Sequence, residues 1–219
     1  SFFLKKIILT LYNYNMELKV KIPQRMQDIT LEQYQRFMKD CSDENQKEDI
    51  IALKMLEIFC GVPVSDSYKL RMSDVYKVCD GINNALKEQP ALINRWRYND
   101  TEFGFIPQLD DMTFGEYVDL DKYIVDWDNM HKAMAVLYRP VLTSFNGKYD
   151  IEDYKGDSYW DLMKKMPLNV VMSSMLFFWT LENDLVKIMI RSLTPEQKRT
   201  YLKKRTSMLN TVGITPFGD

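Results

Sequence analysis

Apolar residues recur along most of the chain at intervals of three and four, which is the spacing of amphipathic helices. Two helix starts carry a capping box, in which Thr30 is followed three residues later by Gln33, and Thr113 by Glu116. Gly61 can adopt the left-handed conformation that closes a helix. The pattern predicts a helix that begins at Thr30 and further helices over residues 50–60, 72–87, 113–123, 130–138, 158–166, 168–190 and 194–209.

Short stretches alternate with a period of two instead. Residues 18–22 read as a half-buried strand, and the aromatic-rich runs 93–98 and 102–106 flank a polar turn, which predicts a short hairpin. Gly104 in the second run marks a bulge or a close approach of another group to the backbone. An Asn-Gly pair at residues 146–147 is a turn signal within a loop or weak hairpin. We therefore expect a mainly α fold, a single globular helical domain with one or two small β-hairpins.

The two ends of the chain differ in pattern from its middle. Residues 1–15 carry an apolar run behind two lysines, roughly as a signal peptide does, but no small-residue cleavage site follows. They are translated upstream sequence if Met16 is the natural start, and a genuine N-terminal helix or strand is the alternative. We expect residues 1–15 to be an upstream or disordered extension, residues 16–210 the single helical domain, and residues 211–219 a flexible tail.

Composition excludes several classes of protein. A chain of 219 residues with 46% hydrophobic and 27% charged residues can bury the core of one domain. Its net charge of −2 makes nucleic-acid binding by the whole surface unexpected, because neutralising phosphates takes a basic face. Cys41, Cys60 and Cys79 have neither disulfide-framework nor metal-site spacing, which fits a reducing compartment. The most apolar stretch, residues 168–181, is too short to cross a bilayer, so no membrane association is expected.

No catalytic or cofactor-binding constellation emerges from the residues. The only histidine, His131, lies in an apolar predicted helix without a nucleophile motif, and neither glycine-rich phosphate-binding motif occurs. Acidic residues crowd into 110–128, where Asp110, Asp111 and Glu116 would serve a metal-dependent nuclease or hydrolase. Helix capping and a solvated acidic face are the simpler explanation, because helix starts favour acidic side chains. We expect no enzyme activity, no bound metal and no cofactor.

The last part of the sequence is basic. Lys203, Lys204 and Arg205 stand in a predicted helix whose only aromatic residue is Tyr201, so a phosphate-binding strip is less favoured than a solvated face or a dock for an acidic protein surface. Pairing of this stretch with the acidic residues 110–128 of another copy would join chains head to tail. A homo-oligomer is therefore a hypothesis that the charges allow.

Several segments of the sequence, and the order in which they occur, resemble a group of small proteins of tailed bacteriophages. They are VKIPQRMQDITLEQYQRFM, FGFIPQLDDMTFGEYVDLDKYI, MAVLYRPV, KYDIEDYKG and MPLNVVMSSMLFFW, and they span residues 20–179. The group comprises tail assembly chaperones and small virion proteins, and the similarity is to versions from phages of Bacteroidota, including the crAss-like group. The resemblance implies a non-enzymatic protein that acts by protein contact, and it carries over no functional residue.

The resemblance implies partners among phage structural proteins, and two roles stay open. A tail assembly chaperone would cover an aggregation-prone partner such as a tape-measure protein. A virion component would instead be a connector ring or packaged cargo in contact with head-tail components. The chaperone would act in the cytoplasm of the host, whereas the virion component would also be present in the particle.

Aromatic side chains beside acidic ones are plausible interface anchors. The simpler explanation for each aromatic residue is core packing, and for each basic residue a solvated face. The residues that we expect to contact a partner are Phe103, Phe105, Phe114, Tyr117, Tyr123, Lys203, Lys204 and Arg205.

Overall fold

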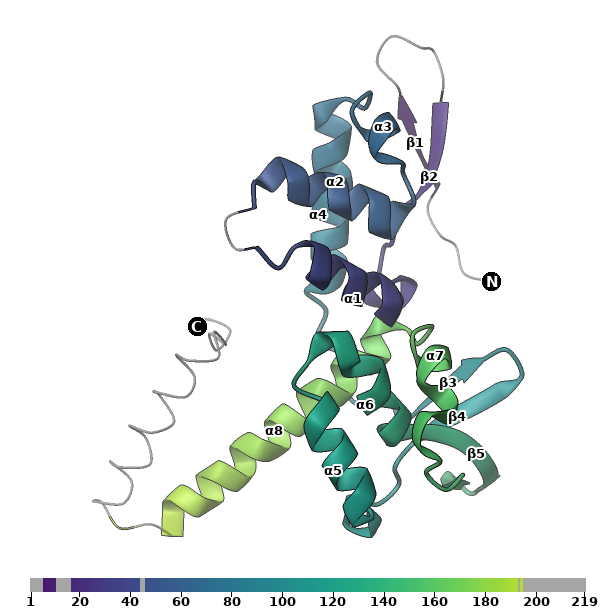
Figure 1. Ribbon diagram of the computed structural model, residues 1–219, viewed down its shortest axis with the longest axis vertical. Helices are drawn as coiled ribbons and strands as arrows, with labels where there is room; N and C mark the ends of the chain where they lie inside the picture. The colour runs from purple at the N-terminus through teal and green to yellow at the C-terminus, as the bar shows by residue number, and fades with distance from the viewer. Residues whose placement is uncertain (1–5, 11–16, 44–45, 193, 195–219) are drawn as a thin grey trace. The chain divides into compact units, whose positions relative to one another are not determined.

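The computed structural model describes residues 6–10, 17–43, 46–192 and 194 (Figure 1). Its helices are α1 (Leu31–Asp40), α2 (Glu48–Cys60), α3 (Val64–Ser67), α4 (Met72–Leu86), α5 (Phe114–Tyr123), α6 (Met130–Leu137), α7 (Trp160–Met163) and α8 (Leu168–Ser192). Its strands are β1 (Lys6–Thr10), β2 (Glu17–Lys21), β3 (Arg95–Tyr98), β4 (Thr101–Phe105), β5 (Tyr138–Phe145) and β6 (Lys148–Ile151).

The chain divides into two compact units, Ser1–Met175 and Leu176–Asp219, and the boundary falls within α8. The first unit contains all the described strands and helices α1 to α7. In the second unit, the rings of Phe177 and Phe178 meet edge to face with their centroids 5.4 Å apart. The helix predicted over residues 194–209 lies outside the described residues beyond its first position.

Local signals set the ends of α1 and α2, as the sequence predicts. The Thr30 hydroxyl accepts a hydrogen bond from the backbone N–H of Gln33 at 3.3 Å, and the Gln33 side chain accepts one from the N–H of Thr30 at 3.0 Å. This reciprocal pair satisfies two donors that a helix start leaves free. Gly61 closes α2 with a φ of 68°, the left-handed conformation that glycine adopts without steric cost. Both predictions are confirmed.

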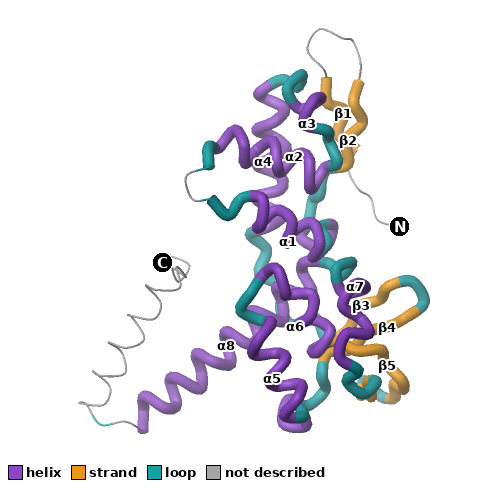
Figure 2. Tube along the Cα trace, in the orientation of Figure 1, coloured by secondary structure: helices purple, strands orange, loops and turns teal. Residues whose placement is uncertain are grey.

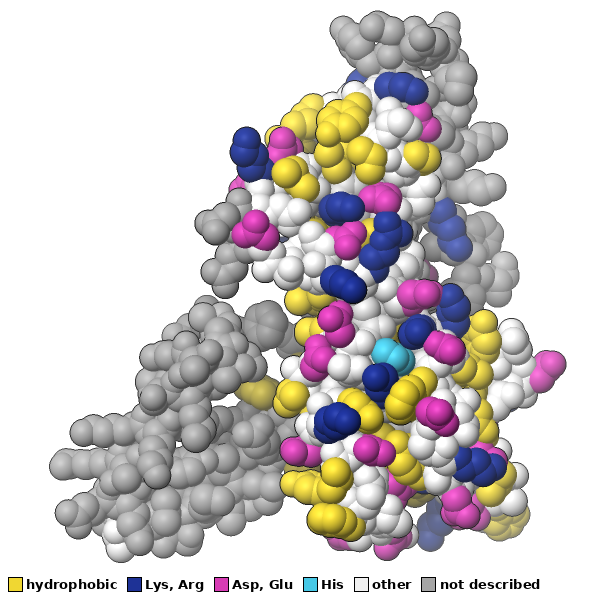
Figure 3. Space-filling view, in the orientation of Figure 1, with side chains coloured by type: hydrophobic (Ala, Val, Ile, Leu, Met, Phe, Trp, Pro, Cys, Tyr) yellow, Lys and Arg dark blue, Asp and Glu magenta, His cyan; other side chains and the backbone are white. Residues whose placement is uncertain are grey.

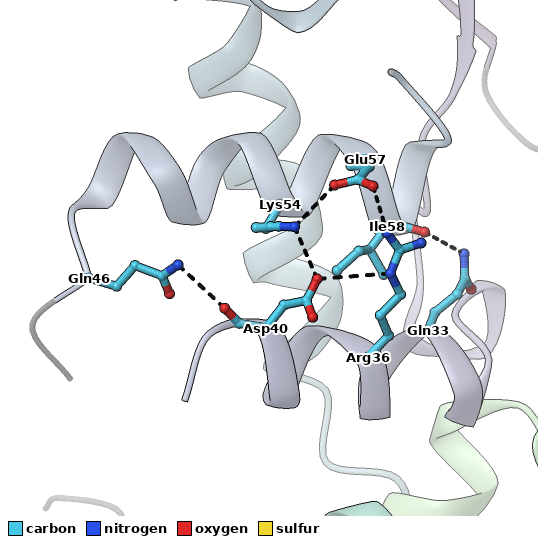
Figure 4. Close-up of polar contacts among 7 residues, drawn as sticks. All are labelled: Gln33, Arg36, Asp40, Gln46, Lys54, Glu57 and Ile58. Carbon is cyan, nitrogen blue, oxygen red and sulfur yellow. Dashed lines mark hydrogen bonds and ion pairs between the residues drawn. The ribbon is translucent and has the colours of Figure 1, made fainter. Parts of the chain in front are cut away.

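A ladder of alternating charges joins α1 to α2 (Figure 4). Arg36 Nη2 lies 2.6 Å from Glu57 Oε1, and Lys54 Nζ lies 3.1 Å from Asp40 Oδ2 and 3.4 Å from Glu57 Oε2. The hydrogen bond to Asp40 is the largest cause that raises the pKa of Lys54. Opposite charges that share partners in this way link the facing sides of the two helices. Figure 4 also shows the side-chain amides of Gln33 and Gln46, which donate to the carbonyls of Ile58 and Asp40.

The strands form two separate sheets (Figure 2). β1 and β2 make a two-stranded antiparallel sheet, so part of the segment 1–15 is paired with residues that the sequence predicts as a strand. The other sheet has four strands in the order β3-β4-β5-β6, and every neighbouring pair is antiparallel. In its centre, Phe103 lies opposite Pro140 and Phe105 lies opposite Tyr138.

The prediction of a mainly α fold with one or two small hairpins is wrong, because the chain has an α+β fold. Both hairpin signals are real: β3 and β4 form one hairpin, and β5 and β6 form another around Asn146 and Gly147, whose φ angles are 49° and 80°. The error concerns residues 138–145, which the sequence predicts as a helix end followed by a loop or weak hairpin but which form β5, a central strand of the sheet. Strand β5 joins the two hairpins into one sheet by pairing with β4, and no local pattern encodes that pairing.

The centre of the sheet is packed by aromatic rings. The ring of Phe103 stacks on that of Trp96 with centroids 5.1 Å apart, and Phe105 meets Tyr138 edge to face at 5.3 Å. Phe103 and Tyr138 are fully buried, and the Tyr138 hydroxyl donates to the carbonyl of Ile93 at 2.9 Å. The sheet therefore has an aromatic core of its own, and α6, whose Met134 is fully buried, leads directly into β5.

Gly104 is a point of close approach, as one of the two sequence interpretations proposes. A Cβ at this position would lie 2.4 Å from Cε2 of Tyr149, whose hydroxyl is held by a hydrogen bond to the carbonyl of Phe105 at 2.7 Å. Because that ring cannot retreat without losing its hydrogen bond, we expect Gly104→Ala to lower the free energy of unfolding by about 1–3 kcal/mol, as overpacked cores do. Urea denaturation measures the change.

Two further variants identify the cause of that loss. In a Tyr149→Ala background the ring is gone, so adding Gly104→Ala should cost well under half of what it costs in the native chain. A Cβ added at Gly115 in α5 would meet no heavy atom within 4 Å, so Gly115→Ala should raise the free energy of unfolding by about 0.5–1 kcal/mol. Equal effects of both glycine substitutions would contradict the steric explanation.

Candidate partner-binding surface

Helix α5 turns an apolar stripe toward solvent. Phe114, Tyr117 and Val118 stand at positions i, i+3 and i+4, and their exposed fractions are 82%, 58% and 45%. We call these three residues the α5 face. Figure 3 shows hydrophobic side chains over this part of the molecule, near the lower edge of the view. A contiguous exposed apolar patch is typical of an interaction site, whereas single exposed apolar residues are ordinary.

The opposite side of α5 fixes this orientation. Leu120 and Tyr123 are buried there together with Glu116, and α5 packs against α6. At the start of the helix, Glu116 Oε2 accepts hydrogen bonds from the N–H and the hydroxyl of Thr113, each at 2.7 Å. The capping box predicted from the sequence is confirmed, and it sets which side of the helix faces the protein.

Glu116 also belongs to a buried ion pair. Its Oε1 lies 2.6 Å from Nη1 of Arg139 on β5, and the two side chains are only 4% and 10% exposed. Each carboxylate oxygen of Glu116 therefore has a partner of its own, the capping residue Thr113 on one side and the guanidinium on the other. Among the described residues, Arg139 Nε has no hydrogen-bond partner. The pair locks α5 to the sheet, because separating two buried charges is costly.

The far end of α5 is held by aromatic contacts. The Tyr154 hydroxyl donates to Asp119 Oδ2 at 2.8 Å, and burial followed by this hydrogen bond raises the pKa of Tyr154. Tyr123 meets Trp160 edge to face with centroids 6.0 Å apart, and the Lys132 ammonium lies 4.7 Å from the Trp160 ring centroid. Both ends of the helix are thus tied down, and the α5 face is presented on a rigid element.

The structure separates the aromatic residues that the sequence groups as partner contacts. Phe103, Phe105 and Tyr123 are buried in the core, whereas Phe114 and Tyr117 are exposed on α5. Local sequence cannot tell these two groups apart, because both combine aromatic and acidic residues. The basic residues of the same set, Lys203, Lys204 and Arg205, lie outside the described residues.

The acidic residues considered for metal chemistry are also separated. Asp110 and Asp111 are exposed in a short 3₁₀ turn before α5, whereas Glu116 is buried and engaged by Arg139. Within the described parts of the chain, no group of three or more histidine, cysteine or acidic side chains is placed to hold a metal ion. Glu116 is therefore separated from the two aspartates, and its contacts are structural.

His131 lies on α6 and is buried. Its Nδ1 is 3.1 Å from Nε2 of Gln35 on α1, so the contact has Nδ1 as the acceptor. Burial is the largest cause that lowers the pKa of His131, followed by the charges of Lys164 and Lys132. The neutral imidazole therefore joins α1 to α6, as a structural histidine does.

A second exposed apolar patch was not anticipated from the sequence. Met72 and Tyr76, four residues apart at the start of α4, are each more than half exposed, as is Tyr68, which follows the last residue of α3; Val64 on α3 is exposed as well. We call these four residues the α4 patch. The spacing of Met72 and Tyr76 is a usable sequence signal for one exposed helix face, but the stronger periodicity of the buried side of α4 obscures it. Figure 3 shows hydrophobic side chains over this end of the first unit as well.

Comparisons with known proteins give no relative in which these surfaces could be compared. A scan against protein-family models, a search of curated proteins and a search of solved structures each found no match to the chain. Within the part of the chain that the structure describes, none of the helices has the length and apolar character that a bilayer crossing requires.

Proposed function

We propose that this chain is a non-enzymatic assembly protein of a tailed bacteriophage, a tail assembly chaperone that binds a structural partner through the α5 face. The observation that carries the proposal is the presence of Phe114, Tyr117 and Val118 in a solvent-facing stripe on a helix held by the buried Arg139–Glu116 pair. The sequence resemblance supplies the class of partner, a tape-measure protein or another tail component. The chain would act in the cytoplasm of the infected host.

The energetics of the α5 face support a binding role. Burying a large apolar side chain such as Phe114 contributes about 1.5–3 kcal/mol, and aromatic residues are enriched among the positions that dominate interfaces. The helix is fixed before the partner arrives, so little ordering cost opposes binding. Tyr117 adds a hydroxyl that can stay hydrated at the rim of a contact.

A chaperone role predicts a gain in partner solubility. We expect co-expression of the chain with the tape-measure protein of the same phage to move that protein from the pellet to the soluble fraction. A Phe114→Ser, Tyr117→Ser variant should lose this effect, because truncating an interface hot spot costs about 2 kcal/mol or more, roughly thirtyfold in affinity per residue. Sedimentation followed by immunoblotting measures the soluble fraction, and co-purification measures the complex.

Phe145 provides the matched control. It is an aromatic residue with an exposed fraction of 79% at the end of β5, so Phe145→Ser removes a similar apolar area at another place. This variant should solubilise the partner as the native chain does. The proposal fails if the native chain neither solubilises nor co-purifies with a tail component, or if both variants behave alike.

A further inference from the structure

Taking the proposed function as its basis, we propose that the segment bound by the α5 face is a basic amphipathic helix of the partner, with apolar residues along one side and lysine or arginine beside them. The proposal rests on what surrounds Phe114, Tyr117 and Val118. The apolar stripe determines where the partner binds, and the charges around it determine the charge of the helix that binds there.

The surroundings of the α5 face are acidic. Asp121 is exposed one turn beyond Tyr117 and Val118, on the same side of the helix, and the exposed Lys122 follows it there, four residues after Val118. Figure 3 shows acidic side chains beside the hydrophobic ones in this region. From residue 110 to residue 128, all of which are described, Lys122 is the only exposed basic side chain. The exposed acidic residues in that range are Asp110, Asp111, Asp121, Asp126 and Asp128.

These charges are available to a partner, in contrast to the other acidic residues of α5. Glu116 is neutralised by Arg139, and Asp119 accepts a hydrogen bond from Tyr154. Asp110, Asp111 and Asp121 form no ion pair among the described contacts, so unneutralised carboxylates stand both before and after the stripe along the chain. Complementary potentials of this kind select a partner and speed its association.

The shape of the α5 face favours a helix over an extended segment. A strand is captured by the free N–H and C=O groups of a sheet edge, whereas the backbone of α5 is satisfied within the helix. Phe114, Tyr117 and Val118 offer only side chains, in a ridge that fits the groove between the rows of a second helix. The ten residues of α5 span about 15 Å, which matches two to three turns of a partner helix.

The α4 patch lacks this charge pattern and serves as an internal comparison. Its neighbouring charges pair with one another, since Lys69 Nζ lies 2.9 Å from Asp66 Oδ1 and Lys77 Nζ lies 3.8 Å from Asp74 Oδ1. A basic helix therefore gains no comparable attraction there. The charges of the α5 face therefore predict that a basic helix binds there in preference to the α4 patch.

The test is a titration of the full chain with two synthetic amphipathic peptides that share one leucine stripe. One peptide carries lysine at its polar positions, and the other carries glutamate. Fluorescence anisotropy should show binding of the lysine peptide at least tenfold tighter than binding of the glutamate peptide, and higher salt should weaken it because exposed charges are screened. Phe114→Ser with Tyr117→Ser should abolish binding, and Asp110→Asn, Asp111→Asn and Asp121→Asn together should weaken it about tenfold or more.

The control variant Tyr68→Ser, Tyr76→Ser alters the α4 patch and should bind the lysine peptide as the native chain does. Equal binding of both peptides, binding that survives Phe114→Ser with Tyr117→Ser, or no binding of either peptide would overturn the proposal. Self-association of the chain that is lost both in that variant and on charge reversal of Lys203, Lys204 and Arg205 would also overturn it, since the occupant would then be a second copy.

The peptide titration tests the basic-helix inference and the co-expression experiment tests the proposed function, so the two proposals can fail independently. If the chain solubilises the tape-measure protein but does not prefer the lysine peptide, the proposed function stands and the basic-helix inference is wrong. If the lysine peptide binds the α5 face but no tail component is solubilised, the preference of the surface stands and the chaperone role is wrong.

Discussion

Replacing Arg139 by methionine should lower the free energy of unfolding by about 3–5 kcal/mol, because it leaves the carboxylate of Glu116 buried without its counter-charge. Methionine fills much of the space of the arginine side chain, so the loss reports the charge and not a cavity. Urea denaturation followed by tryptophan fluorescence measures the change, with the extrapolated free energy compared between variants. A loss below about 1 kcal/mol would contradict a buried pair.

A second substitution should reverse most of that loss. Adding Glu116→Gln to Arg139→Met removes the stranded charge but keeps an amide oxygen for the capping box, the arrangement that Gln33 already provides with Thr30 in α1. The double variant should lie within about 1 kcal/mol of the native chain, since a buried ion pair and its neutral replacement are often close in stability. No recovery would show that Arg139 acts through its packing.

Arg97 gives the matched control for Arg139. It is also an arginine of the four-stranded sheet near an acidic residue, with Nη2 4.0 Å from Glu102 Oε1, but its side chain is 68% exposed. Arg97→Met should therefore change the free energy of unfolding by no more than about 1 kcal/mol, which is the range of surface ion pairs. Similar losses for both arginines would contradict the role of burial.

Two phenylalanines that look alike in the sequence should respond in opposite ways. Phe103→Ala should lower the free energy of unfolding by about 3–5 kcal/mol, because its ring is fully buried against Trp96 and Tyr159. Phe114→Ala should change it by about 0.5 kcal/mol or less, since that ring is mostly in solvent. The same urea measurement serves both variants.

Partner binding should show the reverse order. Phe114→Ala should weaken the complex with the tail component, whereas Phe103→Ala, assayed where the variant is still folded, should leave its affinity unchanged. Far-ultraviolet circular dichroism establishes which conditions keep Phe103→Ala folded. A large stability loss for Phe114→Ala would place its ring in a core and would remove the basis of the α5 face.

The sequence by itself determined the features that depend on neighbours within four residues. The capping boxes at Thr30 and Thr113, the left-handed Gly61 and the turn at residues 146–147 were all readable, because each satisfies its own backbone groups locally. The close approach at Gly104 was readable only as one of two possibilities, since the ring that fills the space comes from a strand much later in the chain.

Only the tertiary structure decided what those elements do together. Strand β5 joins the second hairpin to the first because residues 138–140 pair with residues 103–105, and Arg139 within that pairing forms the ion pair with Glu116. In the folded unit Phe103 is buried in this sheet, whereas Phe114 on α5 is in solvent. Pairing between distant strands is set by total packing and by charge burial across the whole unit, and these are not written in the spacing of any one segment.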